Sequence, residues 1–223
     1  MTRTLRTLLA SALLAALPTA FAEDAKPGEA AATDAAKPAE SASEQAPQPQ
    51  GYHFALTGPG NQAVTDASEP FKDKYLLVAF GFTSCPDVCP TTLYEFAQML
   101  KIVKAPEKIQ PVFISIDPLR DNSERLNQYT GYFDKRIVGL TGSMADIEAT
   151  AKRYSASFGY RHNGKKVVPP DLPEGYTVYH STMIYLISPE RELIDAFDYQ
   201  SGAEKLARDI DKAIAKKEGG AQS

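Results

Sequence analysis

The chain has 223 residues, of which 43% are hydrophobic and 23% are charged, and its formal net charge is −4. This length allows one globular domain of ordinary size with additional segments. The negative charge argues against nucleic-acid binding as the main task, because that task needs a basic surface. No apolar run beyond the first residues is long enough to span a bilayer.

The first residues are typical of an export signal. Arg3 and Arg6 form a basic segment, an apolar run follows from Leu8 to Leu17, and small residues lead to Ala22. We expect a signal peptide over residues 1–22 with cleavage after Ala22. The alternative is an uncleaved anchor in the inner membrane; no cysteine follows the apolar run to carry a lipid. Export predicts the bacterial periplasm, where disulfides persist.

Residues 23–50 are rich in Ala, Pro, Glu and Gln and contain almost no large apolar residue. Such a segment buries too little apolar surface to offset the entropy lost on ordering, so we expect a disordered linker. The folded domain is predicted over residues 51–218.

Strand and helix patterns alternate along this domain. Continuous apolar runs predict buried strands, and apolar residues at helical spacing predict helices between them. Capping residues at 122–123 and 143 mark two helix starts. The predicted elements of the first part are strands over 52–56, 76–81, 109–116 and 137–140, a hairpin-like piece over 62–71, and helices over 91–104, 123–132 and 144–154.

The second part of the domain begins with a long exposed excursion over 158–177, with a hairpin expected around Asn163–Gly164. Strands over 181–187 and 192–199 form a second predicted hairpin, and a helix follows over 203–217. The order β-α-β-α-β-α-β-β-α predicts an α/β, thioredoxin-like fold. Its central sheet is flanked by helices, with an inserted long loop or hairpin near 158–177.

The only two cysteines, Cys85 and Cys89, lie between the strand at 76–81 and the helix that follows it. If Cys89 occupies the first helical turn, both sulfurs face the same space, because positions i and i+4 lie on one side of a helix. The free N–H groups and dipole of a helix N-terminus favour thiolate over thiol. We therefore expect a reactive pair.

Three interpretations of this pair stay open on the residues alone. A structural disulfide would close a loop of only about five residues and constrain the unfolded chain little. A structural zinc site needs four ligands, so two histidines would have to converge on the cysteines. A soft-metal or redox site is the third, since two thiolates and an imidazole suit copper as Cu(I) or Cu(II).

His180 is the best candidate for a third ligand. It is predicted to open the buried strand at 181–187, and sites of open α/β sheets gather at strand ends. His53 is a weaker candidate because it lies on a predicted edge strand, and His162 because it lies in a charged turn.

Three segments resemble the Sco/SenC family of copper-binding assembly factors for cytochrome c oxidase. They are Gly81–Leu93 with its Cys-Pro-Asp-Val-Cys-Pro motif, Phe113–Asp121, and His180-Ser181 before an apolar strand. The resemblance covers about residues 51–214. It implies a thioredoxin-like fold and a copper site with Cys85, Cys89 and His180 as ligands.

The resemblance also implies a function. It is that of a metallochaperone that helps to assemble the dinuclear copper (CuA) centre of the oxidase. The alternative is a thiol:disulfide reductase that keeps the CuA cysteines reduced, with Cys85 and Cys89 as its redox dithiol. We expect a binding protein rather than an enzyme, unless it has this oxidoreductase activity. A peroxiredoxin-like peroxidase is disfavoured, because Phe82 stands where that family has Thr.

The implied partners follow from that function. They are the copper-bearing subunit of the oxidase, a periplasmic thioredoxin-like reductant and other copper chaperones, with no nucleic acid. Asp87 and Asp117 match acidic family positions and are expected to tune the ligands, with loop capping as the alternative. The family usually has Asp before the histidine, where this chain has Tyr179. We expect Tyr179 to shield the site or offer a hydroxyl, and the change to affect copper transfer or docking more than binding.

Overall fold

A computed structural model of the protein describes residues 50–220. The predicted signal peptide lies outside these residues, as does the predicted linker apart from its last residue. Among the described residues, no helix is both long and apolar enough to cross a membrane.

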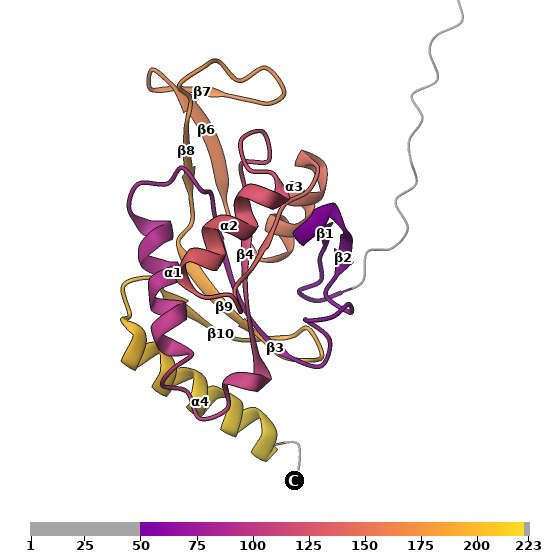
Figure 1. The fold of residues 1–223 in the computed structure, drawn as a ribbon, viewed down its shortest axis with the longest axis vertical. Helices are drawn as coiled ribbons and strands as arrows, with labels where there is room; N and C mark the ends of the chain where they lie inside the picture. Colours follow the sequence, from indigo (N-terminus) through magenta and orange to yellow (C-terminus); the bar gives the residue numbers. More distant parts are fainter. Residues whose placement is uncertain (1–49, 221–223) are drawn as a thin grey trace, which may run out of the picture. The chain divides into compact units, whose positions relative to one another are not determined.

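The core is a five-stranded sheet in the order β10-β9-β3-β4-β5 (Figure 1). Strands β3, β4 and β5 are parallel, whereas β9 runs antiparallel to β3 and β10. Every residue of β3 and β4 is buried, as expected for central strands covered on both faces. The bounds of the strands are β3 Tyr75–Gly81, β4 Ile109–Ser115, β5 Val138–Leu140, β9 Met183–Ile187 and β10 Leu193–Asp198.

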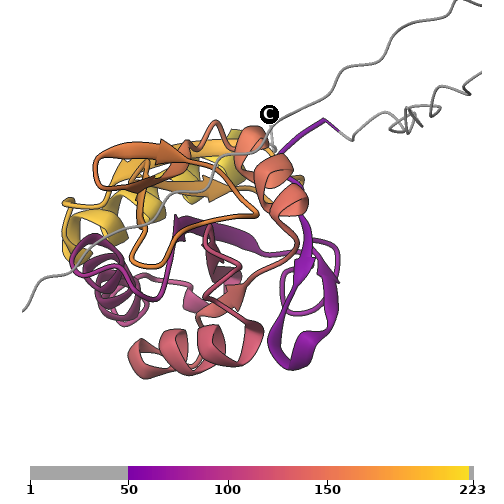
Figure 2. The same cartoon turned by 90° about the horizontal axis from the view of Figure 1, so that it is seen from above.

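Within residues 50–220, four α-helices pack around this sheet. Helix α1 contacts both α2 and α4, and α3 contacts the first strand, β1. Figure 2 shows α1 and α4 side by side. The bounds of the helices are α1 Val88–Met99, α2 Ser123–Phe133, α3 Met144–Arg153 and α4 Ala203–Gly220, with short 3-10 helices η1 Pro59–Asn61 and η2 Pro106–Lys108. The predicted α/β, thioredoxin-like architecture is therefore confirmed.

Helix starts follow the local sequence. Asn122 accepts a hydrogen bond from the backbone N–H of Arg125, and Ser143 caps α3 in the same way. Helix α1 begins at Val88, three residues before its predicted start. Pro90 does not interrupt it, because the first turn of a helix does not use its backbone N–H groups. Cys89 consequently lies in the first turn, as expected.

The excursion after α3 is more ordered than predicted. The hairpin is confirmed: β6 (Phe158–His162) and β7 (Lys165–Val167) flank Asn163 and Gly164, whose φ angles of 49° and 77° suit a two-residue turn. Residues 168–176 beyond it contain no strand or helix, as expected for a long loop. Strand β8 (Thr177–His180) returns to pair with β6 and completes a three-stranded sheet.

The placement of His180 also needs correction. It was expected to open the buried strand of the central sheet, but it is the last residue of β8, and β9 starts at Met183. Two separate sheets, rather than one, therefore meet near this histidine.

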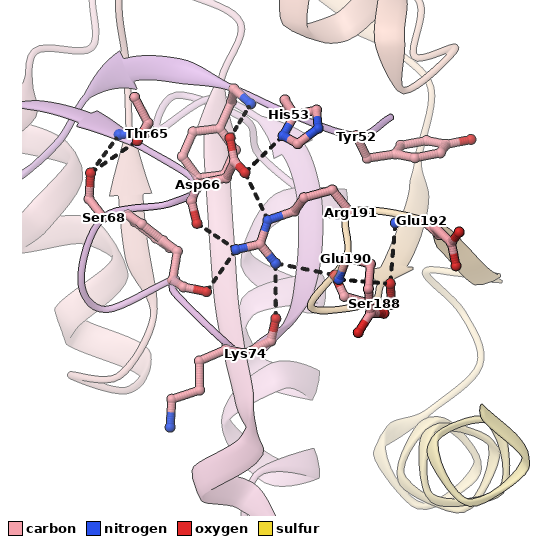
Figure 3. A network of polar contacts seen from close by, with 12 residues as sticks. Tyr52, His53, Thr65, Asp66, Ser68, Lys74, Ser188, Glu190, Arg191 and Glu192 are labelled. Carbon is pink, nitrogen blue, oxygen red and sulfur yellow. Dashed lines mark hydrogen bonds and ion pairs between the residues drawn. The ribbon is translucent and has the colours of Figure 1, made fainter. Parts of the chain in front are cut away.

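The N-terminal part forms the β1 (Ala55–Thr57) and β2 (Ala63–Thr65) hairpin, three residues later than the strand predicted at 52–56. A buried network around Arg191 joins this part to the β9–β10 turn (Figure 3). Arg191 Nε donates to Asp66 Oδ2 at 2.9 Å, and its other nitrogens donate to backbone carbonyls, including that of Phe71. His53 Nδ1 binds the same Asp66 oxygen at 2.9 Å.

Candidate metal centre

The two cysteines and His180 come together at one end of the central sheet. Cys85 lies in the loop after β3, Cys89 in the first turn of α1, and their sulfurs lie within 4.8 Å of each other and of a His180 ring nitrogen. Cys89 Sγ is 3.7 Å from His180 Nε2. The backbone N–H of Cys89 donates to Cys85 Sγ at 3.5 Å. Among residues 50–220, this is the one group of three or more His, Cys, Asp or Glu side chains arranged to hold a metal ion.

The His180 ring is oriented by its own backbone. Its Nδ1 lies 2.7 Å from the Ser181 carbonyl oxygen, which can only accept a hydrogen bond. Nδ1 therefore carries the proton, and the lone pair of Nε2 faces the sulfurs, as in many metal-binding histidines. Phe82 packs edge-on against the ring, with 6.0 Å between centroids.

The two sulfurs differ in their surroundings. Both cysteines are free thiols, Cys85 half-buried and Cys89 buried. The hydrogen bond with Cys89 lowers the pKa of Cys85 to about 3, against the opposing effect of burial and with further help from two backbone N–H groups. The same hydrogen bond, and then burial, raise the pKa of Cys89. Negative charge in the pair therefore rests on Cys85, the more accessible sulfur.

Gly81, the last residue of β3, leaves room for this arrangement. A Cβ at this position would lie 2.7 Å from Cys89 Sγ and 2.6 Å from the ring of Phe113. Real side chains do not approach so closely, so the sulfur occupies space that only glycine provides.

A carboxylate that the sequence analysis did not single out supports the cysteine loop. Asp121 is buried, and its oxygens accept hydrogen bonds from the backbone and hydroxyl of Thr83 and from the hydroxyl of Ser115. Arg125 also donates to the Thr83 hydroxyl, at 2.7 Å. The carboxyl ends of the parallel strands β3 and β4 lie at the same edge of the sheet. A sequence pattern of two such strands therefore indicates that the residues following them can contact each other.

The two predicted acidic neighbours lie differently. The Asp87 side chain is exposed and forms no capping bond to α1, while its backbone N–H hydrogen-bonds to Cys85. Asp117 is buried and accepts hydrogen bonds from Arg120 Nε and the Tyr176 hydroxyl, both at 2.5 Å. The Arg120 guanidinium in turn lies 5.8 Å from the centre of the Phe82 ring. A series of contacts through Arg120 and Phe82 therefore connects Asp117 with His180.

Tyr179 points away from the sulfurs. Side chains alternate along a strand, so Tyr179 and His180 face opposite sides of β8. The Tyr179 ring lies over its cross-strand partner Gly159, where a Cβ would come within 2.4 Å of its hydroxyl, and 5.1 Å from the Arg161 guanidinium. His53 is held by Asp66, and His162 is not part of the group with the cysteines.

The donor set fits copper. Two thiolates and one imidazole are soft to borderline ligands, which copper favours in sites of low coordination number. Structural zinc has four protein ligands, and no fourth His, Cys, Asp or Glu among residues 50–220 joins this group. The Cys-Cys-His group could therefore hold copper.

Comparisons with known proteins agree with this chemistry. The family model described as SCO1/SenC matches residues 42–215. The mitochondrial protein SCO2 of Saccharomyces cerevisiae is 36% identical over 176 residues, which are 74% of this chain and 56% of the yeast protein. The chain thus spans little more than half the length of this curated relative.

Two copper-bound structures are similar to the chain. ScoI of Arabidopsis thaliana with copper bound is 28% identical with a TM-score of 0.64, over 75% of this chain and 99% of that one. ScoI of Bradyrhizobium japonicum with copper bound is 32% identical with a TM-score of 0.61, over 73% of this chain and 98% of that one. With the family match and the site geometry, these similarities identify the chain as a member of the SCO1/SenC family.

Proposed function

We propose that this protein binds one copper ion through Cys85, Cys89 and His180 and acts as a metallochaperone in the assembly of the CuA centre of cytochrome c oxidase. The observation that carries the proposal is the convergence of the three ligand atoms within 4.8 Å. The similar copper-bound ScoI structures support the choice of metal. Copper is the cargo here, so the site must release it as well as bind it.

The site geometry suits release to another protein. Cys85 and His180 are only half-buried, so an incoming thiolate or imidazole can approach the ion from their side. Three ligands leave a coordination position for that incoming group, since copper also accepts a fourth ligand. The partner that supplies it is proposed to be the copper-bearing subunit of the oxidase, with other copper chaperones loading the site.

Copper titration tests the binding step. The reduced protein is titrated with Cu(I) and with Cu(II), together with the variants Cys85→Ala, Cys89→Ala and His180→Ala. We expect one ion per chain in the parent and a loss of binding in all three variants. His162→Ala is the matched control and should bind as the parent does. Parent-like binding by the His180→Ala variant would refute the ligand set.

A thiol:disulfide reductase is the second candidate, favoured by the unequal burial of two free cysteines. The Cys85 thiolate would attack a partner disulfide and release one partner thiol. Cys89 would then attack the Cys85 sulfur in the mixed disulfide and release the second thiol. The dithiol is oxidised to a disulfide as the partner disulfide is reduced, with two electrons transferred.

The reduction potential of the Cys85–Cys89 pair tests this candidate. If the reduction potential of this pair were higher than that of the CuA cysteines, the pair could not reduce them, and the reductase function would be refuted. The His180→Ala variant separates the two functions, because it loses a copper ligand and keeps both thiols. Reductase activity retained in this variant without copper binding would assign the activity to the dithiol alone.

The proposed setting is the periplasm, with the chain exported by its N-terminal signal and the dithiol kept reduced by a thioredoxin-like protein. The curated relative from yeast is mitochondrial, so the compartment must be measured for this chain itself. Fractionation of cells that make the full chain, with the N-terminal residue of the mature protein determined, tests export and cleavage after Ala22. Retention in the cytoplasm would refute this setting.

A further inference from the structure

The outer face of the three-stranded sheet carries two cations that have no anionic partner. Arg161 of β6 lies directly opposite Lys166 of β7 in the strand register. Both side chains are exposed, and neither forms an ion pair within residues 50–220. Glu148 of α3 borders the same small cavity as Lys166 and makes no ion pair with it. Like charges at opposed positions of neighbouring strands destabilise a sheet, so the presence of this pair needs an explanation.

An aromatic ring extends this face. Side chains alternate along a strand and opposed residues share a face, so Tyr179 of β8 lies on the same side as Arg161 and Lys166. Tyr179 is 42% exposed, and the Arg161 guanidinium lies 5.1 Å from the centre of its ring, a cation–π contact. Strands β6, β7 and β8 contain no Asp or Glu, and the carboxylates of the excursion, Asp171 and Glu174, lie in its loop. The face is thus basic on a chain whose formal net charge is −4.

This face adjoins the copper site. Tyr179 precedes the ligand His180, and β8 is an edge strand of its sheet. Cys89 Sγ lies 3.7 Å from His180 Nε2 at the end of this strand, and Figure 1 shows the loop between β3 and α1 beside β8. A protein interface of ordinary size buries about 800 Å² on each partner. A partner that covers Arg161, Lys166 and Tyr179 therefore also reaches the end of β8, where copper is exchanged.

We infer that this basic face, formed by Arg161, Lys166 and Tyr179, docks an acidic surface of the protein that receives the copper. The inference rests on the proposed metallochaperone function and names the chemistry of its partner. Carboxylates on the partner would neutralise the two opposed cations, so docking relieves a repulsion that the free protein retains. Complementary charge also raises the rate at which two proteins meet in the correct orientation.

The variant Lys166→Glu tests the inference. It places a carboxylate directly opposite Arg161, so the face loses its net charge while the hairpin gains an attractive cross-strand pair. Slower docking in this variant would therefore not be a consequence of a weakened fold. Lys166→Arg keeps the charge and should behave as the parent does. Lys216→Glu is the matched control, because Lys216 is an exposed cation on α4, at the other end of the domain (Figure 1).

Three quantities are measured on the full chain: the affinity for Cu(I), the thermal stability without metal, and the rate constant of copper transfer to the purified copper domain of the oxidase subunit at several salt concentrations. We expect Lys166→Glu to bind copper as the parent does and to be at least as stable. Its transfer rate constant at low salt should be about tenfold lower than that of the parent. Added salt should slow the parent and affect this variant little, because ions screen the attraction. Lys216→Glu should match the parent in all three.

Two results would overturn the inference. One is a Lys166→Glu variant that transfers copper at the parent's rate and with the parent's dependence on salt. If that variant had lost only the binding of phosphatidylglycerol vesicles, the face would belong to a membrane instead. The other is an equally slow transfer by Lys216→Glu, which would reflect the total charge of the chain. A parent protein that binds or transfers no copper would instead refute the proposed function itself, and this outcome is visible before any variant is made.

Discussion

Both carboxylate oxygens of the buried Asp121 bind Thr83: Oδ2 accepts from the backbone N–H at 2.9 Å and Oδ1 from the hydroxyl at 2.5 Å. Oδ2 also accepts from the Ser115 hydroxyl at 2.8 Å, at the end of β4. Thr83 lies two residues before Cys85, so this carboxylate fixes the start of the loop that carries the half-buried sulfur. The cysteine loop is therefore fixed by the segment that follows the neighbouring strand β4 as well as by its own helix α1.

Asp121→Asn should loosen this loop. The amide presents N–H groups where the carboxylate accepted hydrogen bonds, so at least one buried donor is left unpaired. We expect the free energy of unfolding to fall by about 2–3 kcal/mol, measured by urea denaturation. Copper affinity should also fall. Asp209→Asn is the control, because Asp209 pairs with Lys205 on the surface of α4 and should change neither quantity. Parent-like stability of Asp121→Asn would contradict the assigned support.

Gly81→Ala should disturb the cysteine site directly. The added methyl group would overlap Cys89 Sγ and the Phe113 ring, and both are fully packed. We expect a loss of stability of about 1–3 kcal/mol and weaker copper binding, seen by denaturation and titration. Gly131→Ala on α2 meets no atom within 4 Å and should stabilise the protein by about 0.5–1 kcal/mol. If both variants behaved alike, the close approach at Gly81 would have no consequence.

Stability should depend on pH through Asp66. Burial alone would raise the pKa of this carboxyl, but hydrogen bonds from His53 and Arg191 and the Phe54 N–H outweigh it and hold the pKa below its usual value. A group with a depressed folded-state pKa stabilises the protein above its unfolded-state pKa of about 3.9. That contribution is lost as the pH falls through the folded-state pKa.

Asp66→Asn removes this contribution. Urea denaturation of the metal-free protein between pH 3 and pH 7 should show the variant less stable than the parent above about pH 5. The difference should shrink at the acid end. A Glu124→Gln variant, altered on the exposed side of α2, should follow the parent. A parent–variant difference that grew toward low pH would have the wrong sign.

Tyr179→Asp restores the residue usual in the family and should leave copper binding intact. Tyr179 and His180 face opposite sides of β8, and Tyr179 contacts Gly159 and Arg161 instead of the sulfurs. We expect one copper ion per chain with an unchanged affinity. The rate of transfer to the copper domain of an oxidase subunit should change, as measured by stopped-flow absorption. Loss of copper from the variant would contradict this orientation.

The sequence was sufficient for the cysteine part of the site. An apolar strand followed by Cys85, Cys89 and a helix leaves few arrangements, because local spacing fixes both sulfurs at a helix start. The order of strands and helices was equally informative about the central sheet. These features depend on short-range patterns, which periodicity reveals.

The surroundings of the site depend on tertiary contacts and were harder to foresee. Strand β8 is short and lacks a continuous apolar run, and its residues alternate between exposed and half-buried, so the sequence pattern does not predict it as a strand. The motif Asp117-Pro-Leu-Arg-Asp121 offers two carboxylates, and spacing does not say which turns toward the cysteine loop. Register across β3 and β4 decides it, and one sequence does not determine that register.

Copper bound at the end of β8 would connect two separate sheets of the protein. Cys89 lies in the first turn of a helix that follows a strand of the central sheet, whereas His180 ends a strand of the three-stranded sheet. An ion held by both closes a covalent-like loop across about 90 residues of chain. Because the ligands converge only in the folded chain, binding of the ion stabilises the folded state by mass action. The two sheets would thus be joined when copper is bound and released from each other when copper leaves. The rigidity of the surface presented to a partner would then depend on whether the site is loaded.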